Sequence, residues 1–434
     1  MTPFRFIHTA DLHLDSKFAG MKGLSDSIRQ HLRESTFTAL RHLMTLAVAE
    51  QVDFIVISGD IYDAADSSLR AHLSLQAAFE ELGSHGIHVY LIHGNHDPLD
   101  GPRLQIKKAE HVHVFGAEVE SYIARRRSDQ QEVAVISGIS YPTSKVTENT
   151  AMKFHRDAES SLFHIAIHHA NVDGDPVHET YSPCTRKELE ATGYDYWALG
   201  HIHQRRVIQE YPHIVYAGNI QGRSVKETGP KGCYVVEVLE DASLVMNFHE
   251  LDSVRWFREE ISIEGIHNED EWRIRVEDKV DAIRQLRPEE MSIVRWIVKG
   301  RSSLHRALES GHVADELEQE LRRREIARAE SGSFGGLVWS ESLSLQSGIE
   351  IDRADILRED SFLGEMMRLE FQAAKEDDFG KELVEKALAQ LMSNRVIRRI
   401  ISESSEQERQ EWLHRAGELG AVLLLDNAAD GGRK

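Results

Sequence analysis

The segment 91–97 constrains this chain more than any other. An apolar run that begins at His88 predicts a buried β-strand, and it stops abruptly at a glycine. Three polar side chains, Asn95, His96 and Asp97, follow with nothing apolar between them. Such side chains at the end of a core strand need polar partners, because burying them without partners is costly. We therefore expect something to bind where this strand ends.

The same pattern recurs four more times along the chain. In each case an apolar run ends in residues that can bind a metal ion. The runs are 4–10 before Asp11 and His13, 53–58 before Gly59 and Asp60, 163–167 before His168 and His169, and 196–199 before Gly200, His201 and His203. Five predicted strands thus deliver carboxylate, amide or imidazole groups at their C-terminal ends, which predicts a metal site.

Strands alternate with helical segments from residue 2 to about residue 252. The segment 24–50 has one apolar helical face, and Ser67 and Ser68 are candidate caps for a second helix. This alternation, with ligands at the C-terminal ends of strands, puts the site in a crevice of a layered α/β domain. We predict that this domain spans residues 1–252.

The pattern changes after residue 252. A small α+β domain is predicted over residues 253–350, and its one compact basic cluster, Arg322 to Arg324, is either a solvated helix face or a weak DNA contact. Residues 351–434 are predicted to be helical. The apolar positions there must meet another helix, either in an intramolecular bundle or on another protein. They include Leu383, Leu391, Val396 and Ile400.

The composition narrows the class of protein. With 434 residues, 41% hydrophobic and 28% charged, the chain has the composition of an ordinary globular protein. No apolar run approaches the roughly 20 residues of a membrane span, and the first predicted strand leaves no room for a signal peptide. We therefore expect no membrane association and a cytoplasmic location. Two cysteines exclude a disulfide framework.

The net charge of −21 bears on nucleic-acid binding. The acidic excess is shared almost equally between the parts before and after Glu250, so neither part is a basic DNA-binding domain. This argues against tight independent binding of DNA. It does not argue against a phosphodiester substrate, because divalent metal ions would dominate the field of the site.

The residue types at the strand ends favour a particular metal chemistry. Asp60 offers two carboxylate oxygens, which is enough to bridge two ions. Mixed carboxylate, amide and imidazole groups suit Mn²⁺, Fe or Zn²⁺ better than Ca²⁺, and the absence of thiols argues against a structural zinc site. Seven ligands with one bridge fit two ions about 3.5–4 Å apart. The candidate ligands are Asp11, His13, Asp60, Asn95, His168, His201 and His203.

Taken together, the five motifs resemble the signature of the calcineurin-like metallophosphoesterases, in the same order. They are Asp11-x-His13, Gly59-Asp60-x-x-Asp63, Gly94-Asn95-His96-Asp97, His168, and Gly200-His201-x-His203. The resemblance implies a sandwich of two β-sheets flanked by helices. It implies one metal on Asp11, His13, Asp60 and His203, and a second on Asp60, Asn95, His168 and His201. His169 competes with its neighbour, and the family's pattern favours His168.

The same resemblance assigns roles to residues that bind no metal. His96 would protonate the leaving oxygen or stabilise charge on the phosphoryl group, and Asp97 would orient it. A hydroxide between the two metals would attack phosphorus. We expect Asp63 and Asp66 to support the metal ligands or to start a helix.

The segment 216–232 resembles the DNA repair exonuclease subgroup of this family, the nuclease subunits of double-strand-break repair nuclease–ATPase complexes. Its characteristic residues include Arg223 and Glu227, whereas Asn219 stands where a small serine is expected. The resemblance implies a Mn²⁺-dependent DNA exonuclease or endonuclease with an SMC-like ATPase as partner, and it makes residues 253–350 a capping domain. A homodimer is also open.

Two other functions remain open. The first is a small-molecule phosphodiesterase or a phosphoprotein phosphatase of the same superfamily, which the long C-terminal extension disfavours. The second is a weakly catalytic scaffold for an SMC-like ATPase. The intact ligand set argues against a scaffold, because a decayed site would be expected to have lost ligands.

Overall fold

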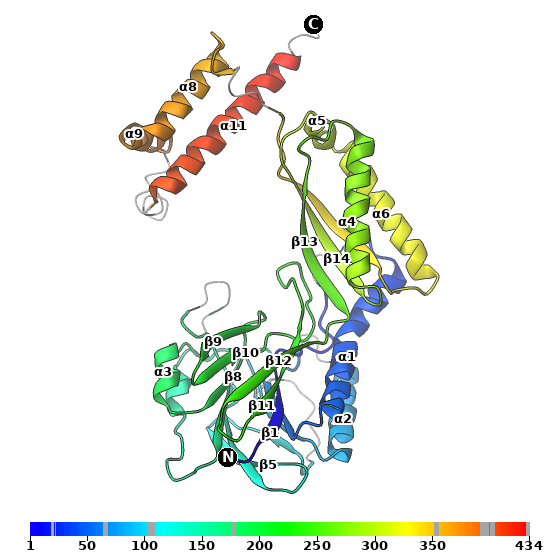
Figure 1. Cartoon of the computed structure of the whole chain (residues 1–434), viewed down its shortest axis with the longest axis vertical. Coiled ribbons are helices and arrows are strands. Elements are labelled where there is room, and N and C mark those ends of the chain that lie inside the picture. The colour runs from blue at the N-terminus through cyan, green and yellow to red at the C-terminus, as the bar shows by residue number, and fades with distance from the viewer. Residues whose placement is uncertain are drawn as a thin grey trace. The chain divides into compact units, whose positions relative to one another are not determined.

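The structure is a computed structural model. It describes residues 1–18, 21, 23–63, 68–101, 109–174, 179, 181–350, 356–390, 399 and 404–430. The chain forms two compact units. The first contains 1–259, 277–296 and 318–343, and the second contains 260–276, 297–317 and 344–434. Figure 1 shows the elements of each unit.

The first unit contains two six-stranded sheets among its described residues. In spatial order the first sheet contains β12 (Leu244–Glu250), β11 (Gly232–Val238), β1 (Phe4–Thr9), β2 (Phe54–Ser58), β3 (His88–Ile92) and β4 (Val112–Val114). The second contains β5 (Glu120–Arg125), β6 (Glu132–Gly138), β7 (Phe163–His169), β8 (Tyr196–Gly200), β10 (His213–Tyr216) and β9 (Arg206–Glu210).

Parallel pairing brings the C-terminal ends of the central strands together. In the first sheet β1 pairs with β2, β2 with β3 and β3 with β4, all parallel. In the second sheet β6, β7, β8 and β10 are parallel neighbours. Parallel strands of this kind are buried on both faces and read as continuous apolar runs. The five runs that the sequence predicts are therefore the central strands β1, β2, β3, β7 and β8.

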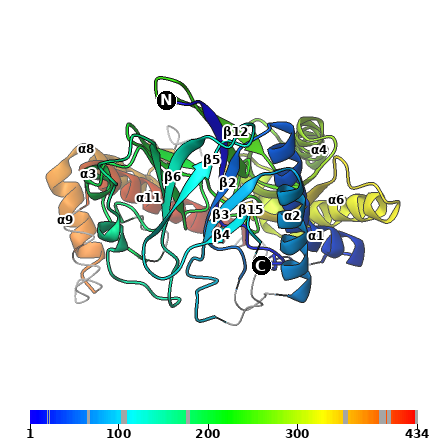
Figure 2. The ribbon, with the colours of Figure 1, turned by 90° about the horizontal axis from the view of Figure 1, so that it is seen from below.

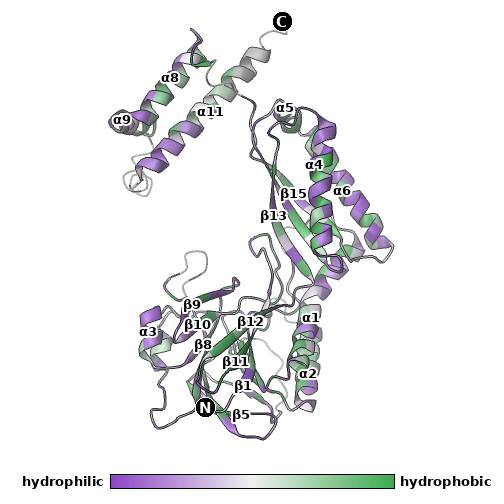
Figure 3. Ribbon diagram, viewed as in Figure 1, coloured by the Kyte–Doolittle hydropathy of each residue, from purple (hydrophilic) through white to green (hydrophobic). Residues whose placement is uncertain are grey.

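The two sheets pack face to face, and helices and loops cover their outer faces. Aromatic side chains dominate the layer between the sheets, where the rings of Phe6 and Tyr196 meet edge to face at 5.3 Å. The outer face of the first sheet is covered by α1 (Asp26–Ala49) and α2 (Leu69–Ser84), which lie side by side in Figure 2. Figure 3 shows green, hydrophobic segments in the strands of this unit beside purple, hydrophilic ones. The predicted sandwich of two sheets flanked by helices is confirmed.

Both long helices begin at serine caps. Ser25 accepts a hydrogen bond from the backbone N–H of Ile28, and Ser68 accepts one from that of Ala71. Such caps satisfy donors that the first turn of a helix leaves unpaired. Of the two predicted caps for the second helix, Ser68 is the one used. Ser67 and Asp66 lie outside the described residues.

The region after β12 forms a three-stranded sheet with charged helices. Its strands are β13 (Val254–Ser262), β14 (Met291–Lys299) and β15 (Val338–Leu345), and its helices are α4 (Glu269–Leu286), α5 (His305–Glu309) and α6 (His312–Glu330). Arg322 of α6 donates to the backbone carbonyls of Ser340 and Glu341, and Arg324 pairs with Glu277. These contacts favour a structural role over DNA contact for the basic cluster.

Three helices follow in the second unit, α8 (Phe362–Lys375), α9 (Asp377–Ala387) and α11 (Glu406–Asp430). They pack on one another through small apolar clusters, one of which joins Ala373, Val384 and Leu413. Leu383 packs against that cluster, whereas the predicted positions 391, 396 and 400 lie outside the described residues. Among the described helices, none is long and apolar enough to cross a membrane.

Candidate dinuclear metal centre

The site lies where β1, β2 and β3 of the first sheet and β7 and β8 of the second reach their C-terminal ends. Four of its residues adopt a positive φ, namely Asp11 at 51°, His13 at 42°, Asp60 at 52° and His201 at 96°. Non-glycine residues rarely adopt such angles, although Asp, Asn and His do so more readily than others. The chain therefore turns sharply after β1, β2 and β8, and it directs the polar side chains into one place.

Glycines let the strand ends approach one another. A Cβ atom on Gly200 would lie 2.0 Å from the carbonyl oxygen of Ser58, and one on Gly94 would lie 2.3 Å from Oδ1 of Asp60. Neither distance is possible for a real side chain. Gly200 is thus required by close contact between the two sheets, and Gly94 by close contact between the loops after β2 and β3 of the first sheet.

His13 and His203 present facing nitrogen atoms. Their Nε2 atoms lie 3.1 Å apart. The Nδ1 of His13 lies 2.9 Å from Asp63, and that of His203 lies 2.6 Å from Glu227. A carboxylate only accepts, so each Nδ1 carries the hydrogen and the two Nε2 lone pairs face each other. With the Asp11 carboxylate beside them, these atoms fit a cation.

A second group of acceptors gathers around Asp60. The Nδ1 of His169 donates to the carbonyl of Ser58 at 2.9 Å, so in the neutral ring, the form that binds a metal, Nε2 presents a lone pair. That Nε2 lies 2.9 Å from Oδ1 of Asn95 and 3.4 Å from Oδ2 of Asp60. Asp11, Asp60 and His169 also form a group whose ligand atoms lie within 4.8 Å of one another. Converging acceptors of this kind fit a second cation.

The structure does not bring His168 to this site, and the prediction of His168 over His169 is corrected here. Successive residues of a strand point to opposite faces. His169 points with the core residues Ile165 and Ile167 toward the other sheet, whereas His168 points outward. There its Nε2 lies 3.2 Å from the hydroxyl of Ser182, and its ring lies near Phe154 and Trp197.

Asp97 does not contact His96 as predicted. Its Oδ1 accepts from the backbone N–H of Gly94, and its Oδ2 accepts from that of Ile61 and lies 3.0 Å from Nδ1 of His93. Asp97 therefore stabilises the backbone of the loop that follows β3.

Asp63 contacts His96 instead. Its Oδ1 lies 2.7 Å from Nδ1 of His96 and 2.9 Å from Nδ1 of His13. The backbone N–H of His96 donates to Asp60 at 2.9 Å, and the His96 side chain is 47% exposed. The one exposed imidazole of the motif thus stands at the edge of the site with its Nε2 directed away from Asp63.

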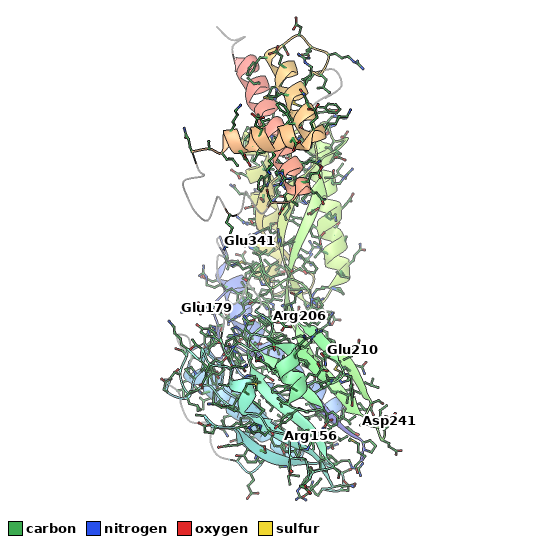
Figure 4. All side chains as sticks on the ribbon, turned by 90° about the vertical axis from the view of Figure 1, so that its left-hand side faces the viewer. Arg156, Glu179, Arg206, Glu210, Asp241 and Glu341 are labelled. Atoms are coloured by element: carbon green, nitrogen blue, oxygen red, sulfur yellow. The ribbon has the colours of Figure 1, made fainter. Side chains whose placement is uncertain are left out.

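Asp11 and His201 are joined through the backbone. The N–H of His201 donates to both carboxylate oxygens of Asp11, at 3.1 and 3.2 Å. The Nε2 of His201 lies 2.9 Å from the carbonyl oxygen of Glu179, a residue labelled in Figure 4. The His201 ring lies 5.2 Å from the ring of His169. The structure therefore brings together every predicted ligand except His168.

Burial and charge shift the pKa values in this cluster in opposite directions. Burial raises the pKa of Asp11. Burial also acts to raise the pKa of Asp60, but the neighbouring His169 and His13 outweigh it and leave the pKa lowered. Burial lowers the pKa of His13 to about 3, with Arg223 contributing. For His169 burial acts to lower the pKa, but the Asp60 carboxylate raises it to about 9.

Sequence reasoning underestimated four supporting residues. Asp63 and Glu227 hold the histidines described above, Arg223 pairs with both carboxylates, and Lys231 donates to the carbonyl of His203 at 2.8 Å. Asp63 stands three residues after Asp60, and the other three belong to the segment 216–232. Their motif membership was visible in the sequence, but their contacts with particular histidines were not.

Comparison with known proteins agrees with this geometry. The family described as calcineurin-like phosphoesterase matches residues 4–205, and the middle domain of metallophosphoesterase YhaO matches residues 256–348. The chain is 39% identical to the uncharacterized metallophosphoesterase YhaO of Bacillus subtilis (strain 168) over 289 residues, which are 66% of this chain and 69% of that protein.

More distant relatives carry the names of a nuclease subunit and of a DNA repair protein. A subunit of the nuclease SbcCD from Staphylococcus saprophyticus is 26% identical over 263 residues, covering 54% of this chain and 65% of that protein. The DNA double-strand break repair protein Mre11 of Thermoplasma acidophilum is 24% identical over 315 residues, covering 70% of this chain and 79% of that protein. With the fold, the convergent ligands and the close YhaO relative in agreement, this chain belongs to the calcineurin-like metallophosphoesterase family.

Proposed function

We propose that this protein is a dinuclear-metal-dependent phosphodiesterase that hydrolyses DNA. The observation that carries the metal-dependent part is the convergence of buried acceptors, where the Nε2 atoms of His13 and His203 face each other at 3.1 Å. Two lone pairs at this distance repel unless a cation lies between or beside them. The DNA substrate is supported by the names of the SbcCD and Mre11 relatives.

Two sets of residues would hold the metal ions. Asp60 is common to both, since its Oδ2 lies 3.8 Å from Nε2 of His13 and 3.4 Å from Nε2 of His169. Nitrogen and oxygen donors without thiols suit Mn²⁺, with Fe or Zn²⁺ as alternatives. When bound, the ions supply Lewis acidity and a nucleophile at neutral pH. The proposed sets are Asp11, His13, Asp60 and His203 for one ion, and Asp60, Asn95, His169 and His201 for the other.

His96 would act on the substrate. Its backbone is tied to Asp60 and its Nδ1 to Asp63, so the exposed ring is held in one orientation. The Nε2 on the opposite side of the ring can then donate a hydrogen bond to the leaving oxygen or to the phosphoryl group. Asp63, and not Asp97, is the residue that orients His96 in this proposal.

One experiment tests metal dependence and substrate class together. Purified protein with Mn²⁺ is offered linear duplex DNA, single-stranded DNA and bis(p-nitrophenyl) phosphate, and Asp60→Asn is the matched control. We expect cleavage of DNA and of the generic diester by the wild type and loss of both with Asp60→Asn or with chelator. Full activity after chelation and dialysis would exclude the two-metal proposal. Cleavage of the generic diester together with no cleavage of either DNA substrate would favour a small-molecule phosphodiesterase.

An SMC-like ATPase is the proposed partner, and the C-terminal helices are its proposed docking region. Phe362 and Leu369 of α8 stand seven residues apart on one side of the helix and are 71% and 43% exposed, and Leu419 of α11 is 61% exposed. Large apolar side chains on a helical surface are typical of a face that enters a groove of a partner. The described helices also pack on one another, and the exposed side chains lie outside those apolar clusters.

The docking face can be tested without truncating the chain. Phe362→Ser combined with Leu369→Ser should abolish co-purification with the ATPase while cleavage of the generic diester stays unchanged. Lys386→Ser, at a position that is 77% exposed on α9, is the control. Undiminished co-purification of the double variant would remove α8 as the docking element.

A further inference from the structure

Arg223 lies between the two carboxylates that hold the histidines of the site. Its Nη1 donates to Oδ2 of Asp63 at 2.9 Å, and its Nη2 lies 3.7 Å from Oε1 of Glu227. Asp63 in turn contacts His13 and His96, and Glu227 contacts His203. One guanidinium therefore reaches three imidazoles through two carboxylates, although it touches none of them in these contacts.

The loop that carries Arg223 is built to hold Glu227 in place. The backbone N–H of Arg223 donates to Oε2 of Glu227 at 2.6 Å, and the side-chain amide of Asn219 donates to the same oxygen at 3.2 Å. A Cβ atom on Gly222 would lie 2.7 Å from the carbonyl oxygen of Glu227, which only glycine avoids. Trp256 also donates to the carbonyl of Gly222. Glu227 thus has little freedom to turn toward the metal positions.

Asp63 needs restraint of a different kind. Together with His13 and His96 it forms a group that could itself hold a metal ion, beside the proposed centre. An ion in that group would use the imidazole that the proposal reserves for substrate. Arg223 occupies Oδ2 of Asp63, and Ser16 donates to the same oxygen. These two donors fix the carboxylate, so that its Oδ1 stays between Nδ1 of His13 and Nδ1 of His96.

We propose that Arg223 is a positioning residue of the dinuclear centre. By binding Asp63 and Glu227 together, it fixes which ring nitrogens of His13, His96 and His203 carry hydrogen, and it holds the Asp63 carboxylate so that Oδ1 accepts from both His13 and His96. This inference rests on the proposed function of the site. It predicts effects on metal affinity and on turnover that a residue important only for folding would not produce. Partners of metal ligands typically contribute about 10–100-fold in metal affinity or activity.

The test compares Arg223→Met and Arg223→Lys with a matched arginine elsewhere. Arg156, labelled in Figure 4, donates to the carbonyl of Gly193 and pairs with Asp195 at 3.2 Å, and Arg156→Met is the control. Binding of Mn²⁺ is followed by the paramagnetic resonance signal of the free ion. Thermal unfolding is measured on the same samples, and kcat and KM are measured with bis(p-nitrophenyl) phosphate.

We expect Arg223→Met to weaken Mn²⁺ binding by about 10–100-fold and to lower kcat with little change in KM, while its thermal midpoint stays near that of Arg156→Met. Added guanidinium ion should restore part of kcat. Arg223→Lys should be intermediate, because an ammonium cannot bridge two carboxylates in a fixed fork. If Arg223→Met does not fold, Arg223→Lys carries the same measurements.

Two results would overturn the inference. One is wild-type Mn²⁺ affinity and kcat in both variants. The other is a loss that follows thermal destabilisation and does not respond to guanidinium. Failure of the proposed function looks different, because the wild type would then bind fewer than two Mn²⁺ ions or leave the diester intact.

Discussion

The outer and inner faces of β7 carry neighbouring histidines that are equally inaccessible to solvent. His168 on the outer face lies against hydroxyl groups and aromatic rings, and burial lowers its pKa to about 3. His169 on the inner face lies 3.4 Å from the Asp60 carboxylate, and its pKa is raised to about 9 despite the same burial. Both residues are fully buried histidines, so the groups that each ring contacts determine the direction of its pKa shift.

This contrast shows why burial alone does not identify a functional histidine. Desolvation disfavours the charged form of both rings, and only a fixed opposite charge reverses that effect. On the inner face the charge comes from a different strand of a different sheet. The distinction between the two histidines is therefore a property of the tertiary fold. Substitutions on either face of β7 test it.

Replacing each histidine by asparagine should give the largest difference. Asparagine approximates the Nδ1 position and deletes Nε2, so His169→Asn loses the proposed ligand atom. We expect it to bind fewer Mn²⁺ ions and to lose diester cleavage almost completely. His168→Asn should keep both ions and most of the activity but lose about 1–3 kcal/mol of stability, since a buried group is removed. Metal analysis, kinetics and thermal unfolding check this pair. Equal metal loss in both variants would contradict the assignment.

His96→Ala extends the comparison to an exposed imidazole of the same site. We expect two bound ions and a loss of activity of about 10²–10⁴-fold, because a group that transfers a proton is removed while the ligands remain. The metal content and kcat of the purified variant are the measurements. One missing ion would show that His96 is itself a ligand.

The two aspartates near His96 should differ less strongly. Asp63→Asn weakens the contacts to His13 and His96, and we expect a loss of about 10–100-fold in kcat. Asp97→Asn disturbs the backbone of the loop, and it should lower the thermal midpoint more than kcat. Parallel kinetics and unfolding of the two variants distinguish these effects. A larger kcat loss for Asp97→Asn would restore the role that the sequence predicted for it.

The smallest expected effect is a pH dependence of stability in metal-free protein. The pKa of His168 is lowered from 6.5 to about 3, so the unfolded chain binds more protons in that interval and stability falls as the pH drops below 6.5. The pKa of His169 is raised to about 9, so its contribution is complete below 6.5 and is lost as the pH rises through 9. Denaturation of His168→Asn should show a shallower decline on the acid side, and that of His169→Asn a shallower decline on the alkaline side. Profiles parallel to the wild type would contradict both shifts.

Much of this architecture was accessible from the sequence because its strands are buried on both faces. Runs such as 54–57 and 89–92 are continuously apolar and are followed closely by ligands, which predicted the central strands and most of the site. The sandwich of two sheets came from the resemblance to the family. The choice between His168 and His169 was also accessible in principle. Residues 163, 165 and 167 are large and apolar, and position 169 continues their face of the strand.

The supporting contacts were not accessible in the same way. Asp63 meets His13 across 50 residues of sequence, and Arg223 meets Asp63 across 160. No local periodicity encodes such pairs, because they follow from how the loops after separate strands converge. The role given to Asp97 failed for the same reason, since adjacency in sequence to His96 did not become adjacency in space.

The positive φ angles of Asp11, His13 and Asp60 limit how this centre could be re-engineered. A change of metal preference would ordinarily start by exchanging ligands, for example by introducing cysteine or glutamate. At these positions the backbone conformation also restricts which residues are tolerated, because Asp, Asn and His adopt the left-handed region more readily than most residues. The same short list of amino acids satisfies both demands. Variation of metal selectivity is therefore easier at His169 or His203, whose backbones lie outside the left-handed region.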